Sequence, residues 1–254
     1  MNAWLDGRFV PESRLPRRRA IAPFETMGAR GGDVPLWDLH LARLAGTAAR
    51  LGLPFAERPD LRAHAAELLR GNGHADDVLR LSLVPDAGGV HVVLTTRARS
   101  PVRVVRLLPT VVPRPDDAPP GDIKAEPRAF YDAVRQQAQD GGADDGIVVA
   151  ADGAVLECAL GSLWLRLDGV WTTPELDGRV LPGIARGLLL AAGARLGAGL
   201  AERTCDLADL HRATALAHGN AVHGVRPARL GDAEPAVAIV DSELGALWRA
   251  ATAD

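Results

Sequence analysis

Residues 123–132 read Ile-Lys-Ala-Glu-Pro-Arg-Ala-Phe-Tyr-Asp and contain Lys124, the only lysine among the 29 basic residues of the chain. Arginine stays protonated at any accessible pH, whereas a lysine amine can lose its proton and then act as a nucleophile or a base. In a chain so dominated by arginine, a lysine indicates a task that arginine cannot perform, such as Schiff-base formation or proton transfer at carbon. Lys124 is therefore a candidate catalytic residue, and the alternative is a chance lysine on an exposed loop.

Two further residues of this stretch belong to one face of an expected helix. Pro127 suits the first helical position because its fixed φ angle is compatible with helical backbone. In a helix that begins there, Arg128 and Tyr131, the only tyrosine, are three residues apart and face the same way. A cation beside an amine favours the neutral amine, so Arg128 is a candidate neighbour of the lysine. An ordinary helix N-terminus with a half-buried tyrosine is the alternative.

A carboxylate lies in a mostly apolar stretch further along the chain. Residues 152–165 contain Glu157 between Leu156 and Cys158. A buried carboxylate is costly unless it meets a cation or a proton donor, and a protonated heteroaromatic nitrogen would meet that need. A glutamate that faces solvent at a strand edge is the alternative.

Three segments could bind an anion. Residues 181–186, Leu-Pro-Gly-Ile-Ala-Arg, form a turn into a helix, and the unpaired N–H groups of a helix start bind phosphate well. Arg43 lies on the mostly apolar helix expected at 36–51, where an arginine either pairs with an anion or extends its head to solvent. Asn220 lies in a turn of small residues, 218–225, that could also present N–H groups to an anion.

The hydrophobic periodicity and the turn residues predict an α+β protein. The expected elements are a strand at 2–10, a hairpin over 20–30 turned by residues 31–33, helices at 36–51 and 60–70, a hairpin of 78–84 with 90–96, a helix from about 127, hairpins turned by Asp152-Gly153 and Asp168-Gly169, and helices at 183–196 and 243–251. Five prolines and the pair Asp116-Asp117 indicate an exposed linker. We therefore expect a small N-terminal α+β domain at 1–108, a linker at 109–122 and a larger C-terminal α+β domain at 123–254.

Composition excludes several classes of protein. The 254 residues are 47% hydrophobic with a net charge of −3, which indicates a folded core and gives no sign of nucleic-acid binding. No apolar run reaches the roughly 18–20 residues of a membrane span, and the first residues do not resemble a signal peptide. Two cysteines and seven histidines in no ligand spacing give no metal motif. We expect a cytoplasmic protein without metal, membrane or nucleic-acid partner.

Taken in order, these segments resemble the fold-type IV pyridoxal-phosphate (PLP) enzymes, the class IV aminotransferase family. That family includes branched-chain and D-amino-acid transaminases and 4-amino-4-deoxychorismate lyase. The matching segments are Phe24-Glu25-Thr26-Met27, His40 to Leu44, Lys124, Val155-Leu156-Glu157, Thr173-Pro174 and Leu181 to Arg186. The resemblance implies a two-domain α+β fold of the D-amino-acid transaminase type, with a cofactor cleft between the domains.

The resemblance also implies a role for each candidate residue. Lys124 matches the lysine that forms the Schiff base with the cofactor, and Glu157 matches the carboxylate that bonds the pyridine nitrogen. The expected phosphate-binding residues are Arg43, Gly183, Ile184, Ala185, Asn220 and Ala221. The candidates for substrate contacts are Thr26, Arg30, Arg97, Arg128 and Tyr131. Ala185 replaces a frequent threonine of the family, so backbone N–H groups would have to bind the phosphate there.

Within the family, residues 124–132 and 220–227 are more similar to the lyase branch than to the transaminases. The leading hypothesis is a lyase of folate biosynthesis that forms 4-aminobenzoate and pyruvate from an amine substrate. The alternative is an aminotransferase that acts on D-amino acids or branched-chain amino acids. A catalytically inactive relative is the third possibility, and it predicts no cofactor. Gly28 stands where an arginine is common, so the residue that binds the substrate carboxylate is open. The family also implies a homodimer.

Overall fold

The computed structural model describes residues 1–17 and 20–253, which form two compact units. Unit 1 comprises Met1–Pro101 and Ile123–Pro127, and unit 2 comprises Val102–Asp122 and Arg128–Asp254. Each unit has its own sheet and its own hydrophobic core. Among the described residues, no helix has the length and apolar character needed to cross a bilayer.

Unit 1 is built on a six-stranded sheet with strand order β2-β1-β5-β4-β3-β7. Every strand pairing in this sheet is antiparallel. The elements of the unit are β1 (Asn2–Leu5), β2 (Arg8–Pro11), the 3-10 turn Glu12–Arg14, β3 (Ala22–Gly28), α1 (Trp37–Arg50), α2 (Leu61–Gly71), β4 (Val78–Asp86), β5 (Gly89–Arg97) and β7 (Ala125–Glu126).

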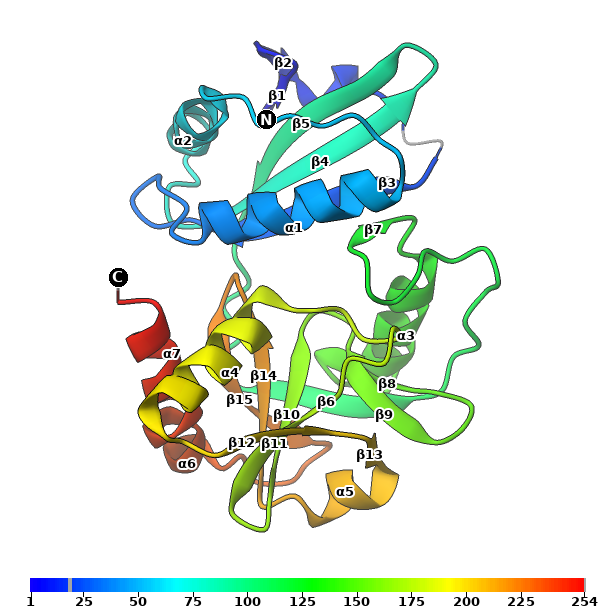
Figure 1. Ribbon diagram of the computed structural model, residues 1–254, viewed down its shortest axis with the longest axis vertical. Coiled ribbons are helices and arrows are strands. Elements are labelled where there is room, and N and C mark those ends of the chain that lie inside the picture. Colours follow the sequence, from blue (N-terminus) through cyan, green and yellow to red (C-terminus); the bar gives the residue numbers. More distant parts are fainter. Residues whose placement is uncertain (18–19, 254) are drawn as a thin grey trace. The chain divides into compact units, whose positions relative to one another are not determined.

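The two helices of unit 1 pack on one face of this sheet, and α1 lies against β3 (Figure 1). Apolar residues recur every three or four positions along α1, so they form one stripe that is buried against the sheet. The buried apolar side chains of this stripe are Trp37, Leu41, Leu44 and Ala48. They share a core with Met27, Leu79 and Leu81 of the sheet. Residues of β3 and β4 between these core positions therefore point to the opposite face.

At the tip of the β4–β5 hairpin, His91 bonds two aspartates. Its Nδ1 lies 2.6 Å from Asp6 Oδ2, in the turn between β1 and β2, and its Nε2 lies 2.7 Å from Asp86 Oδ2. The hydrogen bonds to Asp6 and Asp86, together with their charges, raise the pKa of His91 above its ordinary value, although burial opposes the shift. The imidazole thus links the two hairpins, and its raised pKa favours the protonated form.

We expect His91→Gln to lower the free energy of unfolding by about 0.5–1 kcal/mol near pH 6, the range of partly exposed ion pairs. Because folding raises the pKa of His91, this stabilisation is complete below its ordinary pKa and is lost as the pH rises through the folded value. Urea unfolding at about pH 6 and about pH 9 measures the difference, with the exposed His211→Gln as control. An equal loss at both values would contradict the prediction.

Unit 2 is built on a nine-stranded sheet with strand order β12-β11-β10-β14-β15-β6-β8-β9-β13. The pairs β6–β8, β6–β15 and β11–β12 are parallel. The elements are β6 (Val105–Thr110), α3 (Ala129–Asp140), β8 (Asp145–Val149), β9 (Ala154–Cys158), β10 (Ser162–Leu167), β11 (Val170–Pro174), α4 (Ile184–Leu196), β12 (Leu200–Arg203), β13 (Cys205–Asp206), α5 (Leu207–Arg212), β14 (Ala215–Asn220), β15 (Gly224–Leu230), α6 (Val237–Ser242) and α7 (Leu244–Ala251).

One buried cluster of side chains packs α4 and α7 against the strands of unit 2. Leu189 of α4, Leu244 of α7 and Trp164 of β10 belong to one buried cluster, and Figure 1 shows the two helices next to each other. The hairpins predicted at Asp152-Gly153 and Asp168-Gly169 are confirmed as β8–β9 and β10–β11. Gly153 and Gly169 both have positive φ, the conformation that such turns require.

The N-terminal strands differ from two sequence predictions. The strand expected at 2–10 is a hairpin of β1 and β2, because the chain turns at Asp6-Gly7, both with positive φ. The prediction of a hairpin over 20–30 is wrong. An isolated bridge joins Arg30 and Asp33, but β3 pairs with β4 and β7. The turn therefore leads into α1 rather than into a returning strand.

The segment around the expected linker also divides differently. Val105–Thr110 is a strand that pairs with β8 and β15, so this part of 102–122 belongs to unit 2. Ile123–Pro127 belongs to unit 1 because β7 pairs with β3. Both differences come from backbone pairing with strands that are distant in sequence, which a composition rich in proline does not reveal.

Candidate functional site

Lys124 lies immediately before β7 in unit 1. The backbone N–H of Phe24 donates to its carbonyl oxygen over 3.0 Å, which extends the pairing of β7 with β3. Its Nζ lies 4.8 Å from the centre of the Phe24 ring. Lys124 is half-buried, and the Phe24 ring forms an aromatic wall beside its amine.

Arg80 lies beside the same ring and pairs with Glu126, and neither residue was predicted as a site residue. The guanidinium carbon of Arg80 is 3.8 Å from the centre of the Phe24 ring, and its Nη2 donates to Glu126 Oε1 over 2.7 Å. Arg80 is paired in register with Thr26, a candidate substrate contact. Strand alternation was the available signal, because Phe24 and Thr26 share one face of β3 while Lys124 and Glu126 are two residues apart.

The opposite face of β3 carries a buried ion cluster of Glu25, His40 and Arg43. Arg43 Nε donates to Glu25 Oε1 over 2.8 Å and its Nη2 to Oε2 over 2.6 Å, while His40 Nδ1 lies 2.7 Å from Oε2. Burial alone would raise the pKa of Glu25. The charge and hydrogen bonds of Arg43, together with His40, lower it to about 2 instead. Glu25 is thus a permanent anion that holds Arg43 in one orientation.

His40 is neutral in this cluster. Burial lowers the pKa of His40, Glu25 only partly offsets the effect, and the charges of Arg43 and Lys124 lower it further. A neutral imidazole that donates from Nδ1 has an acceptor lone pair on Nε2. That atom is buried without a hydrogen-bond partner, so the cluster has an open acceptor.

In unit 2, Tyr131 and Glu157 meet. Glu157, at the end of β9, is 5% exposed, and the Tyr131 hydroxyl donates to its Oε1 over 2.8 Å. Arg128, at the N-cap of α3, lies with its guanidinium carbon 4.9 Å from the centre of the Tyr131 ring. Its Nη2 donates to the carbonyl of Ala159 over 2.7 Å. The structure therefore brings Arg128, Tyr131 and Glu157 together within unit 2.

The expected phosphate-binding segments of unit 2 meet at Ser162. The N-cap of α4 is Gly183, and no side chain caps the first turn, so its N–H groups are available to an anion. A Cβ at Gly183 would lie 2.7 Å from Ser162 Oγ, and Ser162 pairs in register with Gly219, just before Asn220. The helix start and the turn of Asn220 therefore flank the same residue.

The Asn220 side chain shapes this turn. Its Oδ1 accepts from the N–H groups of Val222 and His223, and its Nδ2 donates to the carbonyl of Leu160 over 3.1 Å. The side chain of Asn220 is thus engaged with backbone. Its contribution to an anion site would come through the shape of the turn that contains Ala221.

A buried network supports the loop that Asn220 contacts. Asp145 Oδ2 accepts from the N–H of Leu160 over 3.0 Å and lies 3.2 Å from His218 Nε2. Arg226 Nη2 lies 3.3 Å from His218 Nδ1, so the contacts assign Nδ1 as acceptor and Nε2 as donor. Asp145, Cys158 and His218 place three possible metal-ligand atoms within 4.8 Å of one another. Because Asp145 and Arg226 engage both ring nitrogens of His218, we interpret the cluster as a structural network.

We expect His218→Gln to lower the free energy of unfolding by about 1–2 kcal/mol, since it disturbs a buried, hydrogen-bonded network that supports the Leu160 loop. Urea unfolding measures the change, and the exposed His211→Gln, also in unit 2, is the control. The control should change stability by less than about 0.5 kcal/mol. A His218 variant as stable as the control would show that the network contributes little.

The profile of the amino-transferase class IV family matches residues 22–230. The chain belongs to the class IV aminotransferase family. Members of this family are PLP-dependent enzymes, and the two-sheet α+β fold is that of fold type IV. No curated protein matches the sequence.

Solved structures of several class IV aminotransferases and related enzymes share this fold. A putative 4-amino-4-deoxychorismate lyase from Legionella pneumophila is 22% identical, with a TM-score of 0.78, over 89% of this chain and 90% of its own. The branched-chain amino acid aminotransferase of Escherichia coli is 18% identical, with a TM-score of 0.81, over 97% and 94% of the two chains. A hypothetical aminotransferase from Mycobacterium tuberculosis, in a PLP-bound form, is 20% identical, with a TM-score of 0.81, over 99% of both.

The side chains of this class IV aminotransferase-family chain fit PLP. A pyridine nitrogen needs a carboxylate, and Glu157 is buried with a tyrosine hydroxyl at Oε1. A phosphate needs N–H groups or a cation. Unit 2 offers the uncapped start of α4, and unit 1 separately offers the guanidinium of Arg43, which Glu25 orients. The aldehyde needs an amine, and Lys124 is the only lysine.

Other predicted contacts are less enclosed. Arg30 and Arg97 are exposed, and Arg97 Nη1 donates to the carbonyl of the next residue. Thr26 is half-buried on the Phe24 face of β3.

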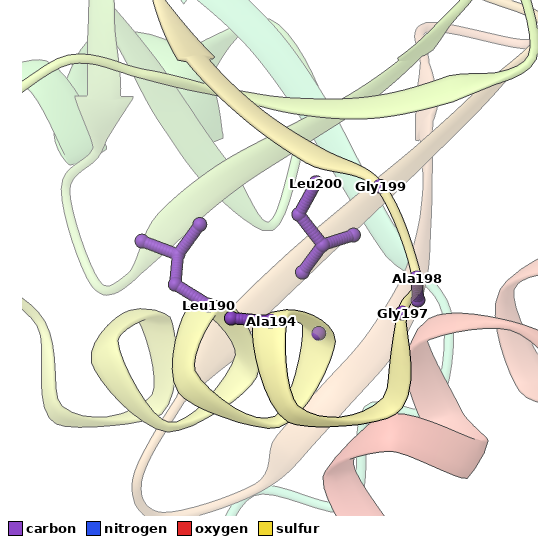
Figure 2. A pocket seen from close by; sticks show the side chains of 7 residues that line it. Leu190, Ala194, Gly197, Ala198, Gly199 and Leu200 are labelled. Atoms are coloured by element: carbon purple, nitrogen blue, oxygen red, sulfur yellow. The ribbon is translucent and has the colours of Figure 1, made fainter.

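Figure 2 shows a separate pocket at the C-terminal end of α4, where side chains of Leu190 and Leu200 point into the same space. Only glycine, alanine and leucine line that pocket, so its side chains offer no polar group for catalysis.

Proposed function

We propose that this class IV enzyme is a 4-amino-4-deoxychorismate lyase, which forms 4-aminobenzoate and pyruvate. The observation that carries the proposal is the segment 124–132. Its Lys-x-x-x-Arg-Ala-Phe-Tyr-Asp pattern is similar to the lyases, whereas transaminases more often have a tyrosine five residues after the lysine. The contacts of Arg128 and Tyr131 with Ala159 and Glu157 give both side chains of this segment a defined place in unit 2.

We assign each part of PLP to residues whose chemistry suits it. Lys124 would hold the PLP aldehyde and Glu157 its ring nitrogen. The phosphate would be held by Arg43, by the backbone of Gly183, Ile184 and Ala185, and by the turn of Asn220 and Ala221. When bound, PLP withdraws electrons from the carbon that carries the substrate's amino group.

The side chains then have separate tasks. Once its amine is released by the substrate, Lys124 removes the proton from the amine-bearing carbon, as a general base. Glu157 holds a proton at the ring nitrogen. Glu25 keeps Arg43 oriented through the two hydrogen bonds between them. A lyase also needs a proton on the departing pyruvate fragment, and the Lys124 ammonium can return the one it removed.

Product analysis tests the proposed lyase activity. Incubation of the PLP-loaded protein with 4-amino-4-deoxychorismate is expected to release 4-aminobenzoate and pyruvate in equal amounts, measured by chromatography and by a lactate dehydrogenase assay. D-alanine and leucine with 2-oxoglutarate serve as competing substrates. No 4-aminobenzoate, together with rapid oxo-acid formation from either amino acid, would contradict the lyase and favour the aminotransferase.

An aminotransferase that acts on D-amino or branched-chain amino acids is the second candidate. The E. coli and M. tuberculosis structures to which this chain is similar carry aminotransferase names. In that reaction, Lys124 would move the same proton from the substrate carbon to the cofactor side of the C–N bond. Family resemblance also leads us to propose a homodimer, and light scattering of the purified protein tests this.

A further inference from the structure

Charged groups from three parts of unit 2 surround Tyr131. The Tyr131 hydroxyl donates a hydrogen bond to the carboxylate of Glu157 on β9 over 2.8 Å. The guanidinium carbon of Arg128, at the N-cap of α3, lies 4.9 Å from the ring centre, and that of Arg114, in the segment between β6 and β7, lies 5.6 Å from it. Tyr131 therefore has an anion at its hydroxyl and two cations near its ring.

Further contacts hold these neighbours in place. Arg128 donates to the carbonyl of Ala159, two residues after Glu157, and so ties the start of α3 to the end of β9. Arg114 donates to the carbonyl of Pro119 and lies 4.8 Å from the centre of the Phe130 ring. The ring of Tyr131 thus has few positions open to it, and its hydroxyl is directed at Glu157.

We propose that Tyr131 is a positioning residue whose hydroxyl anchors Glu157 through Oε1 and thereby orients the carboxylate toward the ring nitrogen of PLP. This inference rests on the proposed function, because it needs a bound cofactor. It assigns Tyr131 a role other than the substrate contact suggested by sequence. Arg114 and Arg128 hold the ring, and neither they nor Tyr131 need touch the substrate.

The protonation state of Tyr131 supports this role. Burial raises the pKa of the Tyr131 hydroxyl, the charge and hydrogen bond of Glu157 raise it further, and Arg114 opposes the shift. The phenol therefore remains a donor throughout the range in which an enzyme works. The hydrogen bond from the Tyr131 hydroxyl disperses the negative charge of the Glu157 carboxylate. Loss of this hydrogen bond should therefore alter how strongly Glu157 would hold a proton on the PLP ring nitrogen.

The single tyrosine makes the hydrogen bond measurable without cofactor. Tyrosinate absorbance near 295 nm reports Tyr131 alone, since the chain has no other tyrosine. In folded apoprotein we expect no ionisation at the ordinary value of about 10, and in Glu157→Gln we expect ionisation at a pH at least about one lower than in the wild type. Circular dichroism monitors folding at each pH. Ionisation of folded wild-type protein near 10, unchanged in Glu157→Gln, would overturn the proposal.

Cofactor binding provides a second test of the role of Tyr131. Tyr131→Phe is expected to raise the Kd for PLP about tenfold and to shift the pH midpoint of the bound cofactor's absorption. Trp171→Phe is the matched control, because it also removes one hydrogen bond to a glutamate of unit 2, from Nε1 to Glu243. It should change neither quantity. Wild-type protein that binds PLP while Tyr131→Phe behaves like the control would overturn this inference alone. Wild-type protein that binds no PLP would overturn the proposed function as well.

Discussion

The variant Lys124→Arg is expected to fold normally and to lose at least about a thousandfold in turnover, with no stable uptake of PLP. An arginine cannot form the covalent bond to the aldehyde or accept a proton from carbon at any working pH. The fold should tolerate it, because Lys124 contacts β3 through its carbonyl oxygen and the Phe24 ring through its charge, and arginine keeps both features.

Absorption spectra and urea unfolding test this prediction together. The variant should show no cofactor band after gel filtration, and its free energy of unfolding should change by less than about 1 kcal/mol. Arg80→Lys is a useful comparison, because it places a second lysine beside the same Phe24 ring without removing Lys124. Retention of the wild-type band and turnover in Lys124→Arg would exclude a catalytic role for this lysine.

The second large effect concerns stability, through Glu25. This carboxylate is fully buried and accepts two hydrogen bonds from Arg43 and one from His40. In Glu25→Gln, the amide group would direct N–H donors at the Arg43 donors, and the cation would lose its counter-charge. Removing one partner of a buried pair costs about 3–5 kcal/mol. Because Arg43 retains some access to solvent, we expect a loss of about 3 kcal/mol.

The pH dependence gives a second measure of the same pair. Folding lowers the pKa of Glu25 from 4.5 to about 2, so the ionised carboxylate stabilises the folded state above about pH 4.5, and this contribution disappears as the pH falls toward 2. The lowered pKa of His40 has the same effect on stability. Because the folded state binds this proton less readily, stability falls as the pH drops below the ordinary pKa of 6.5.

Urea unfolding of Glu25→Gln across this range should therefore show a weaker acid dependence between about pH 4.5 and 2 than the wild type shows. The exposed Glu67→Gln on α2 is the control and should preserve the wild-type profile. If Glu25→Gln were as stable as this control at neutral pH, the ion cluster would contribute nothing to unit 1.

Local patterns in the sequence predict most of the helices and turns of this protein. The helix expected at 36–51 is α1, Trp37–Arg50, because its apolar spacing matches the stripe that is buried against the sheet. The turns at Gly153 and Gly169 were predictable because few residues other than glycine adopt positive φ readily. In both cases, residues close together in sequence determine the structure.

The features that the sequence did not predict depend on contacts between residues far apart in the chain. The two residues of β7 pair with β3 about a hundred positions earlier, and no periodicity can appear in so short a strand. The partner of Arg43 was likewise unpredictable, because Glu25 lies in a strand whose apolar pattern does not show which helix covers it. Arg114 was assigned to a linker, although its guanidinium lies over the rings of Phe130 and Tyr131.

If the Lys124 amine binds PLP, reductive trapping will locate the bond. Sodium borohydride converts the bond between a lysine and the cofactor aldehyde into a stable secondary amine, and peptide mass mapping then locates the label. With one lysine in the chain, we expect a single labelled peptide, containing Lys124, in nearly every molecule. A protein that stays colourless with PLP and carries no label at Lys124 would contradict this expectation.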